Sequence, residues 1–390
     1  MLESRPRLEE LDSIRGIAAL TVVFYHCATV VGGGALGVYL LRSPFAILIA
    51  GRSAVIMFFM LSGFVLSLPY HRATKVSYSR LMIKRIFRLY VPYLAAILTA
   101  LLVRSLFKHP QVLSFWIQPI TPKALWQDLL MIGQNNQMYL DPVTWSLTQE
   151  MRISILFPIL MFIVLRFRWE KTLLIGFLLS CTGIVYHLIW QNSVDLYTNY
   201  FDTLHYIMMF MVGALIARNR SNLGRLFTHI ATPTKVVVGI FGLICYSVHD
   251  YLSWKLQEYG YGTLGPFLLT DWVVVIGAAI LIVTAITNKN VSRTLLFPPF
   301  KFLGKISYSL YLFHFIVILT LMKIFPHAPF YIIDPCVVSI SILIGSIAHY
   351  LIESPSMKLG KLLTAKHYST GKGSLELSVS IKLYGESERR

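Results

Sequence analysis

Arg15 and His26, both in the first apolar run of the chain, are the residues most suited to chemistry. They are separated by ten residues. Eleven steps of about 100° come within about 20° of three full turns, so the two side chains share one helix face roughly 16 Å apart. An imidazole can take a proton from a hydroxyl and return it to a leaving group near neutral pH, which acyl transfer requires. A lone intramembrane histidine is more often a hydrogen-bonded packing residue, so both interpretations of His26 stay open.

A dense basic segment precedes the third apolar run. Arg85 and Arg88 in this segment are three residues apart and share a helix face. Two guanidinium groups in this arrangement suit forked binding of phosphate oxygens. The alternative is an ordinary topology signal with contacts to lipid headgroups.

An acid lies near the start of the fourth apolar run, in the sequence from Trp145 to Arg152. Ser146 and Glu150 are four residues apart and lie on one helix face. Glu150 could orient or charge-balance His26, or hold a sugar hydroxyl. The alternative is a local pair with Arg152.

The ninth run carries a second set of polar side chains. Ser307, Tyr311 and His314 fall on one side of a helix, with Tyr308 adjacent. Hydroxyl groups that face a bundle interior can bind a polar ligand, but they also join helices to one another. The spacing alone favours the structural role.

The elements that must position these residues are membrane spans. The 390 residues are 56% hydrophobic and 14% charged, which suits a membrane and not a soluble globule. The apolar runs have the length of a helix that crosses the hydrocarbon core, and only helices or closed barrels can do so. We predict an all-α polytopic bundle of about ten spans, at 11 to 31, 48 to 68, 89 to 107, 144 to 165, 172 to 190, 203 to 217, 236 to 250, 266 to 287, 306 to 325 and 335 to 352.

The distribution of charge predicts the orientation. The net charge is +17, and most of the basic residues fall in one of the two alternating sets of connecting segments. By the positive-inside rule we expect both termini to be cytoplasmic. We expect the basic residues to contact lipid headgroups and not nucleic acid. We predict one transmembrane domain over 1–355 and a cytoplasmic tail over 356–390, in which alternation from Leu375 to Leu383 indicates a short strand or a disordered end.

Cysteine usage points to packing and not to a metal site. The four cysteines are isolated within apolar runs, without the paired spacing of a metal or disulfide framework. We therefore expect no metal cofactor.

Six motifs in the same order resemble those of the acyltransferase-3 family of membrane acyltransferases, which modify carbohydrates such as O-antigen, exopolysaccharide and peptidoglycan. The resemblance runs nearly end to end. Its residues are Arg15 through His26, Phe58-Phe59-Met60-Leu61-Ser62-Gly63-Phe64, Arg85 with Arg88, Trp145-Ser146-Leu147 with Glu150, Lys305-Ile306-Ser307-Tyr308-Ser309-Leu310-Tyr311-Leu312 with His314, and Glu353-Ser354-Pro355.

The resemblance implies a ten-span enzyme of the cell membrane that uses cytoplasmic acyl-CoA, with acetyl-CoA as the expected donor. It implies that Arg15 and His26 are essential, that Glu150 belongs to the catalytic set and that Arg85 and Arg88 lie near the donor. The acceptor contacts are then expected among the remaining motif residues, namely Trp145, Ser146, Tyr308, Tyr311 and His314.

Two departures from the family pattern stand out. Many members have an acidic or polar residue just before the double phenylalanine, where this chain has Val55, Ile56 and Met57. Some members also carry a C-terminal esterase-like domain, and we expect none in the tail. We therefore expect no role for an acidic or polar side chain at that position, and we expect acyl hand-off to an esterase-like domain to be absent or supplied by another protein.

The expected acceptor is a hydroxyl of a polysaccharide, a glycolipid or a glycosylated small molecule. A transporter or flippase of a polar or lipid-linked sugar is the alternative, since it would also place ionisable residues within the membrane, although the chain shows no internal repeat. A non-catalytic scaffold would not need Arg15 and His26 in phase.

Overall fold

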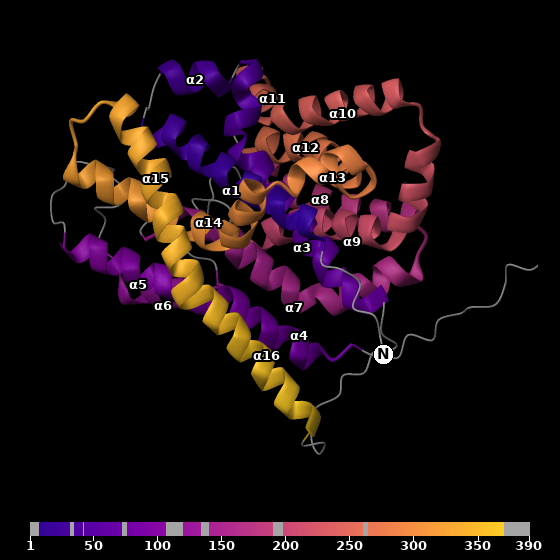
Figure 1. Ribbon diagram of the computed structural model, residues 1–390, viewed down its shortest axis with the longest axis horizontal. Helices are drawn as coiled ribbons and strands as arrows, with labels where there is room; N and C mark the ends of the chain where they lie inside the picture. The colour runs from indigo at the N-terminus through magenta and orange to yellow at the C-terminus, as the bar shows by residue number, and fades with distance from the viewer. Residues whose placement is uncertain are drawn as a thin grey trace, which may run out of the picture.

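Helices make up the architecture. The computed structural model describes residues 8–31, 35–41, 43–71, 76–106, 120–133, 140–189, 198–259 and 264–369, and these residues form helices and no strand (Figure 1). The all-α prediction is confirmed. The strand or disordered end predicted between Leu375 and Leu383 lies outside the described residues.

The first half of the bundle contains the helices that carry most of the motif residues. They are α1 (Glu9–His26) with a π-helical turn (Cys27–Val31), α2 (Ala35–Leu41), a 3₁₀ turn (Pro44–Ile49), α3 (Gly51–Ser67) with a 3₁₀ turn (Leu68–His71), α4 (Tyr78–Arg85), a π-helical turn (Ile86–Tyr90), α5 (Val91–Leu106), α6 (Pro122–Leu130), a 3₁₀ turn (Pro142–Thr144) and α7 (Trp145–Arg166).

The second half closes the bundle around α1 and α3. It consists of α8 (Trp169–Ile189), α9 (Tyr200–His229), α10 (Thr232–Ser247), α11 (His249–Glu258), α12 (Leu264–Thr287), α13 (Lys289–Leu295), α14 (Pro298–Ile324), α15 (Phe330–Ala348), a π-helical turn (His349–Glu353) and α16 (Ser354–Ser369).

The predicted spans correspond closely to helices. In the described part of the chain, eight helical segments are long and apolar enough to cross a membrane, and the α10–α11 pair, bent by 51°, makes a ninth. Helix α8 covers the remaining predicted run, 172 to 190. The chain is therefore an all-α, multi-pass bundle.

The third predicted span begins too late. The helical segment starts at Tyr78 and not at residue 89, so Arg85 and Arg88 lie within the span and not before it. Hydropathy detects only the apolar part of a span, whereas the helix continues through basic turns into the interfacial region.

Close backbone contacts hold the centre of the bundle together. Helix α1 packs on α14, and α3 packs on α9 and α1. A Cβ atom at Gly16 would collide with the backbone of Gly304, and a Cβ atom at Gly63 would collide with the backbone of Phe210. Small residues at such crossings allow membrane helices to approach closely, which brings α1, α3 and α14 near enough to share a site.

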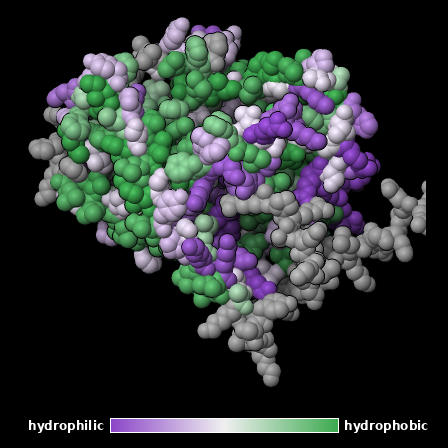
Figure 2. Space-filling model, in the orientation of Figure 1, coloured by the Kyte–Doolittle hydropathy of each residue, from purple (hydrophilic) through white to green (hydrophobic). Residues whose placement is uncertain are grey.

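The outside of the bundle is apolar. Figure 2 shows hydrophobic side chains over much of one face, with hydrophilic side chains gathered toward α4, α13 and α16. On α10 the exposed side chains include Val236, Val237, Ile240, Phe241 and Ile244. A lipid-facing surface accounts for this exposure.

Candidate active site

His26 and His314 face each other between α1 and α14, although they lie 288 positions apart in the chain. Nδ1 of His26 is 2.9 Å from Nε2 of His314. His314 is fully buried, whereas His26 is half-buried at the C-terminal end of α1. The edge of the Phe315 ring packs against His26, with centroids 4.9 Å apart. His26 is thus fixed by His314 on one edge and still partly accessible.

The hydrogen bonds around His314 determine the tautomer of both rings. Nδ1 of His314 lies 2.6 Å from the backbone oxygen of Tyr311. A carbonyl oxygen only accepts, so Nδ1 of His314 carries the proton and its Nε2 carries a lone pair when the ring is neutral. His26 must then donate from Nδ1, which leaves Nε2 of a neutral His26 unprotonated. This nitrogen has the lone pair that a general base requires.

Ser146 and Tyr311 join α7 to α14 beside this pair. Their hydroxyl oxygens are 2.8 Å apart, and the Tyr311 hydroxyl donates to the backbone oxygen of Val143 at 2.9 Å. Both side chains are buried, and the ring of Phe58 meets Tyr311 edge-on with centroids 5.5 Å apart. The two predicted acceptor residues therefore lie together and are held by defined bonds.

Glu150 pairs with Arg85. Oε1 of Glu150 accepts from Nη2 of Arg85 at 2.8 Å and from the hydroxyl of Ser62 at 2.7 Å. Arg85 also donates from Nε and Nη2 to the hydroxyl oxygen of Ser154, at 3.1 and 2.8 Å. The structure thus places Glu150 next to a predicted donor residue, while the partner of His26 is His314.

Arg152, the alternative partner considered for Glu150, has a different role. It donates to the backbone oxygens of Ile132, Gly133 and Thr198 at 2.9, 2.8 and 2.8 Å. Its guanidinium carbon lies 4.4 Å from the ring centroid of Tyr200. Arg152 therefore ties two connecting segments to α7.

Arg15 is buried against the middle of α3. It donates to the backbone oxygen of Leu61 at 3.2 Å and pairs with Asp12 at 3.3 Å. Leu61 precedes Ser62, the partner of Glu150, so Arg15 belongs to the same polar cluster as Arg85.

Arg88 adds a third cation to this cluster. Its charge acts on Arg15, Arg85 and Glu150. Its side chain is half-buried, and among the described residues it makes no hydrogen bond or ion pair. The three guanidinium groups outnumber the two carboxylates near them, Asp12 and Glu150, so the cluster suits an anionic ligand.

Tyr308 lies on the same side of the bundle as Arg88. Its hydroxyl donates to the backbone oxygen of Leu89 in the π-helical turn, at 2.7 Å. Nearby, the carboxylate of Glu353 accepts from Ser309 at 2.6 Å and lies 3.0 Å from Nδ1 of His349. Tyr308 is thus bonded to the turn that carries Arg88, whereas Tyr311, with which it was grouped as an acceptor residue, is bonded to Ser146 and Val143.

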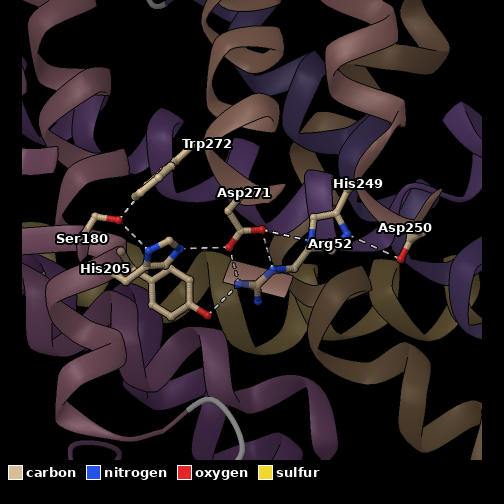
Figure 3. A network of polar contacts seen from close by, with 8 residues as sticks. Arg52, Ser180, His205, His249, Asp250, Asp271 and Trp272 are labelled. Atoms are coloured by element: carbon tan, nitrogen blue, oxygen red, sulfur yellow. Dashed lines mark hydrogen bonds and ion pairs between the residues drawn. The ribbon is translucent and has the colours of Figure 1, made fainter. Parts of the chain in front are cut away.

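A second buried polar network was not predicted from the sequence. It is centred on Asp271 and includes Arg52, His205 and His249 (Figure 3). Arg52 also lies over the ring of the motif residue Trp145. Asp271 and His205 stand within predicted spans, where an ionisable side chain is a functional hypothesis by default. Asp271 and His205 could therefore have been identified from the sequence. Arg52 could not, because it lies near the edge of its predicted span, where a basic residue is typical of a connecting segment.

Asp141 is a buried acid just before α7 and outside the spans. Its Oδ1 accepts from the backbone nitrogen of Val143 at 3.4 Å. Burial raises the pKa of Asp141 to about 8, against the smaller opposing effect of that hydrogen bond. The group that caps the 3₁₀ turn before α7 is therefore sensitive to pH in the neutral range.

Among the described residues, no group of three or more histidine, cysteine or acidic side chains is placed to hold a metal ion. The polar clusters are instead one histidine pair and several ion pairs, which can move protons and bind anions.

Comparison with known proteins gives the family. The model of an acyltransferase domain, acyltransferase-3, matches residues 8–351. The O-acetyltransferase OatA of Staphylococcus aureus is 24% identical over 376 residues, covering 90% of this chain and 58% of that protein. The peptidoglycan O-acetyltransferase OatA of Listeria monocytogenes is 21% identical over 333 residues, covering 81% of this chain and 50% of that protein.

The chain thus spans little more than half the length of the curated relatives it matches. No solved structure matches it. The family model covers nearly all of the transmembrane bundle, including every residue of the histidine pair and of the arginine cluster. The chain belongs to the acyltransferase-3 family of multi-pass membrane proteins.

Proposed function

We propose that this protein transfers an acetyl group from acetyl-CoA to a hydroxyl of a carbohydrate, with His26 as the general base. The observation that carries the proposal is the hydrogen-bond chain from His26 through His314 to the backbone oxygen of Tyr311. These hydrogen bonds leave the lone pair of a neutral His26 on Nε2, which takes part in neither of them.

The chemistry balances around that lone pair. As the acceptor oxygen attacks the thioester carbonyl, its proton passes to Nε2 of His26. The carbon–sulfur bond then breaks, and the proton returns to the departing thiolate of CoA. A hydroxyl and a thioester are consumed, and an ester and a thiol are formed. His314 acts as a positioning residue, because it holds the ring and its tautomer without contacting the reacting atoms.

The donor is assigned to the arginine cluster. CoA carries phosphate groups, and a cluster in which cations exceed carboxylates attracts them. Arg88 is the stronger candidate for direct contact, since Arg85 is already engaged by Glu150 and Ser154. Arg85 then keeps the cluster in place and contributes its charge.

Direct transfer and transfer through an acylated His26 use the same lone pair. The acceptor is assigned to the side of Trp145, Ser146 and Tyr311, at the predicted external end of α7. The Listeria relative is named for peptidoglycan, so an N-acetylhexosamine glycan is the acceptor class to test first.

The test uses the full chain purified into nanodiscs with radiolabelled acetyl-CoA and an N-acetylglucosamine tetrasaccharide. We expect label on the glycan with the wild-type protein and a loss of about 10²- to 10⁴-fold in His26→Ala. His327→Ala is the matched control, because His327 is exposed and lies outside the site. Label trapped on the protein before the glycan is added would identify the acylated-histidine route.

Two results would overturn the proposal. Turnover by His26→Ala above about a tenth of the wild-type rate would exclude the general-base role. Movement of the glycan across a proteoliposome membrane without any transfer of label would identify a transporter.

A further inference from the structure

Asp271, on α12, is a fully buried carboxylate to which three side chains donate. Its Oδ1 accepts from Nε of Arg52 at 3.0 Å and lies 3.2 Å from Nε2 of His249. Its Oδ2 accepts from Nη2 of Arg52 and lies 3.1 Å from Nε2 of His205 (Figure 3). A carboxylate has about four acceptor sites, so this one is saturated and its charge is matched by the guanidinium.

His205, one of the two donors to Oδ2, is itself held by a chain of hydrogen bonds. The indole nitrogen of Trp272 donates to the hydroxyl of Ser180 at 2.8 Å, and that oxygen lies 2.7 Å from Nδ1 of His205. The Asp271 carboxylate only accepts, so a neutral His205 carries its proton on Nε2 and donates it to Asp271. Nδ1 of His205 then accepts from the hydroxyl of Ser180, which in turn accepts from Trp272. These hydrogen bonds fix the orientation of the His205 ring against Asp271.

The network gathers several helices at the predicted external end of the bundle. Arg52 comes from α3, His205 from α9 and His249 from the start of α11, where the α10–α11 pair bends. Nδ1 of His249 lies 3.6 Å from a carboxylate oxygen of Asp250, so the imidazole stands between two acids. The arrangement fixes Arg52 from the side opposite the motif residues.

The other side of Arg52 is turned toward aromatic rings. Its guanidinium carbon is 5.2 Å from the ring centroid of Trp145 and 5.3 Å from that of Tyr206, whose hydroxyl accepts from Nη2 at 2.9 Å. Trp145 also meets Phe59, with centroids 6.2 Å apart. Trp145 is the first residue of α7 and immediately precedes Ser146. Asp271 therefore acts on the motif helix through one planar guanidinium group.

We propose that Asp271 is a positioning residue: it holds Arg52 against Trp145 and so fixes the acceptor-side end of α7. This inference rests on the proposed function for the identity of the reaction. If the ion pair of Arg52 and Asp271 contributed only to stability, apolar side chains could replace it. Replacing both members of a buried ion pair by well-packed hydrophobic residues often leaves the free energy of unfolding unchanged. The positioning role has no such substitute, since an aliphatic side chain offers Trp145 neither charge nor a planar group.

The deciding variant is therefore Arg52→Met/Asp271→Leu, which removes both charges together, so that neither member of the ion pair is left buried alone, and takes the acceptor only from His205 and His249. Its matched control is Lys255→Met/Glu258→Leu, which neutralises the exposed ion pair on α11. Lys255 lies 4.3 Å from the ring centroid of Trp254, so each double variant removes a cation from one tryptophan.

Fluorine NMR of the fluorotryptophan-labelled full chain tests the contact without any need for turnover. The two resonances are assigned by their loss in Trp145→Phe and Trp254→Phe. We expect the Arg52/Asp271 variant to shift or broaden only the Trp145 resonance of the two, and the control to affect only that of Trp254. An unchanged Trp145 resonance in a folded Arg52/Asp271 variant overturns the inference, whether or not the wild-type protein acetylates the tetrasaccharide.

Kinetics then test the positioning role. We expect the KM for the tetrasaccharide to rise about tenfold or more in the Arg52/Asp271 variant, while the KM for acetyl-CoA stays within about twofold. Arg52→Lys, which keeps the charge but loses the fork, should fall between this variant and the wild type. Unchanged kinetics in a folded Arg52/Asp271 variant overturn the inference, and so does an equal rise in both KM values.

Discussion

His314 offers the sharpest test of the histidine pair, because it can be replaced without touching the reacting atoms. His314→Phe keeps a ring of similar size in the fully buried position but removes the acceptor for Nδ1 of His26. His314→Gln puts an amide oxygen on a side chain of similar reach and can restore an acceptor. The two variants differ in the one property that the proposed mechanism needs.

The size of the effect follows from the 2.9 Å hydrogen bond between the rings. Without an acceptor, the reactive tautomer of His26 leaves a donor unsatisfied at a cost of about 1 to 3 kcal/mol. His26 avoids that cost by moving its proton to Nε2, which removes the lone pair. We therefore expect kcat to fall roughly 5- to 150-fold in His314→Phe, a smaller loss than the ~10²- to 10⁴-fold expected for His26→Ala.

The assay is label transfer to the tetrasaccharide in nanodiscs, with thermal unfolding of each variant as the check on folding. The expected order of kcat is wild type, His314→Gln, His314→Phe and then His26→Ala. If His314→Phe is folded and within about twofold of wild type, the tautomer argument is wrong. If Gln and Phe give the same loss, His314 contributes shape and not a hydrogen bond.

Three other outcomes test the donor site, the orientation and the capping acid. Arg88→Lys should raise the KM for acetyl-CoA about tenfold or more while the matched Arg80→Lys does not, because lysine keeps the charge and loses the fork; equal values would leave the cluster as a topology signal. In intact cells an impermeant maleimide should label Gln257→Cys and spare Ser79→Cys, both at exposed positions, and the reverse result would invert the predicted orientation. Burial raises the pKa of Asp141 in the folded protein to about 8, whereas the ordinary pKa of an aspartate is about 4. Between these two pH values the carboxyl group is ionised in the unfolded state but not in the folded state, so the free energy of unfolding of the wild type falls as the pH rises. Asp141→Asn should therefore raise the unfolding temperature at about pH 8 and leave it unchanged at about pH 4, and a shift of the same size at both would contradict this assignment.

The spans could be predicted because hydropathy is a local property. The run 144 to 165 became α7 (Trp145–Arg166), and the run 266 to 287 became α12 (Leu264–Thr287). The ends of amphipathic spans could not be predicted in the same way, since α4 begins at Tyr78 in a basic segment that hydropathy excludes.

The partners within the site could not be predicted, because pairing across helices is not local. Helical phase placed Arg15 and His26 on one face of α1, but it carried no information about His314, which meets His26 from 288 positions away. Glu150 was expected beside His26 or Arg152, but it binds Arg85, which lies on α4. Residues on one helix can be related by spacing, whereas residues on different helices require the packing itself.

Helix α7 connects the two ends of the candidate site. It presents Trp145 to the Asp271 network, Ser146 to Tyr311, and Glu150 and Ser154 to Arg85. Ser146, Glu150 and Ser154 recur every four residues and lie along one face, and the helix rises roughly 13 Å from Trp145 to Ser154. A donor bound from the predicted cytoplasmic side and an acceptor from the predicted external side would therefore be brought into register by a single rigid element. Because the first half of α7 is held at Trp145 by Arg52 and at Glu150 by an ion pair with Arg85, weakening either contact should change the KM of the substrate on its own side first.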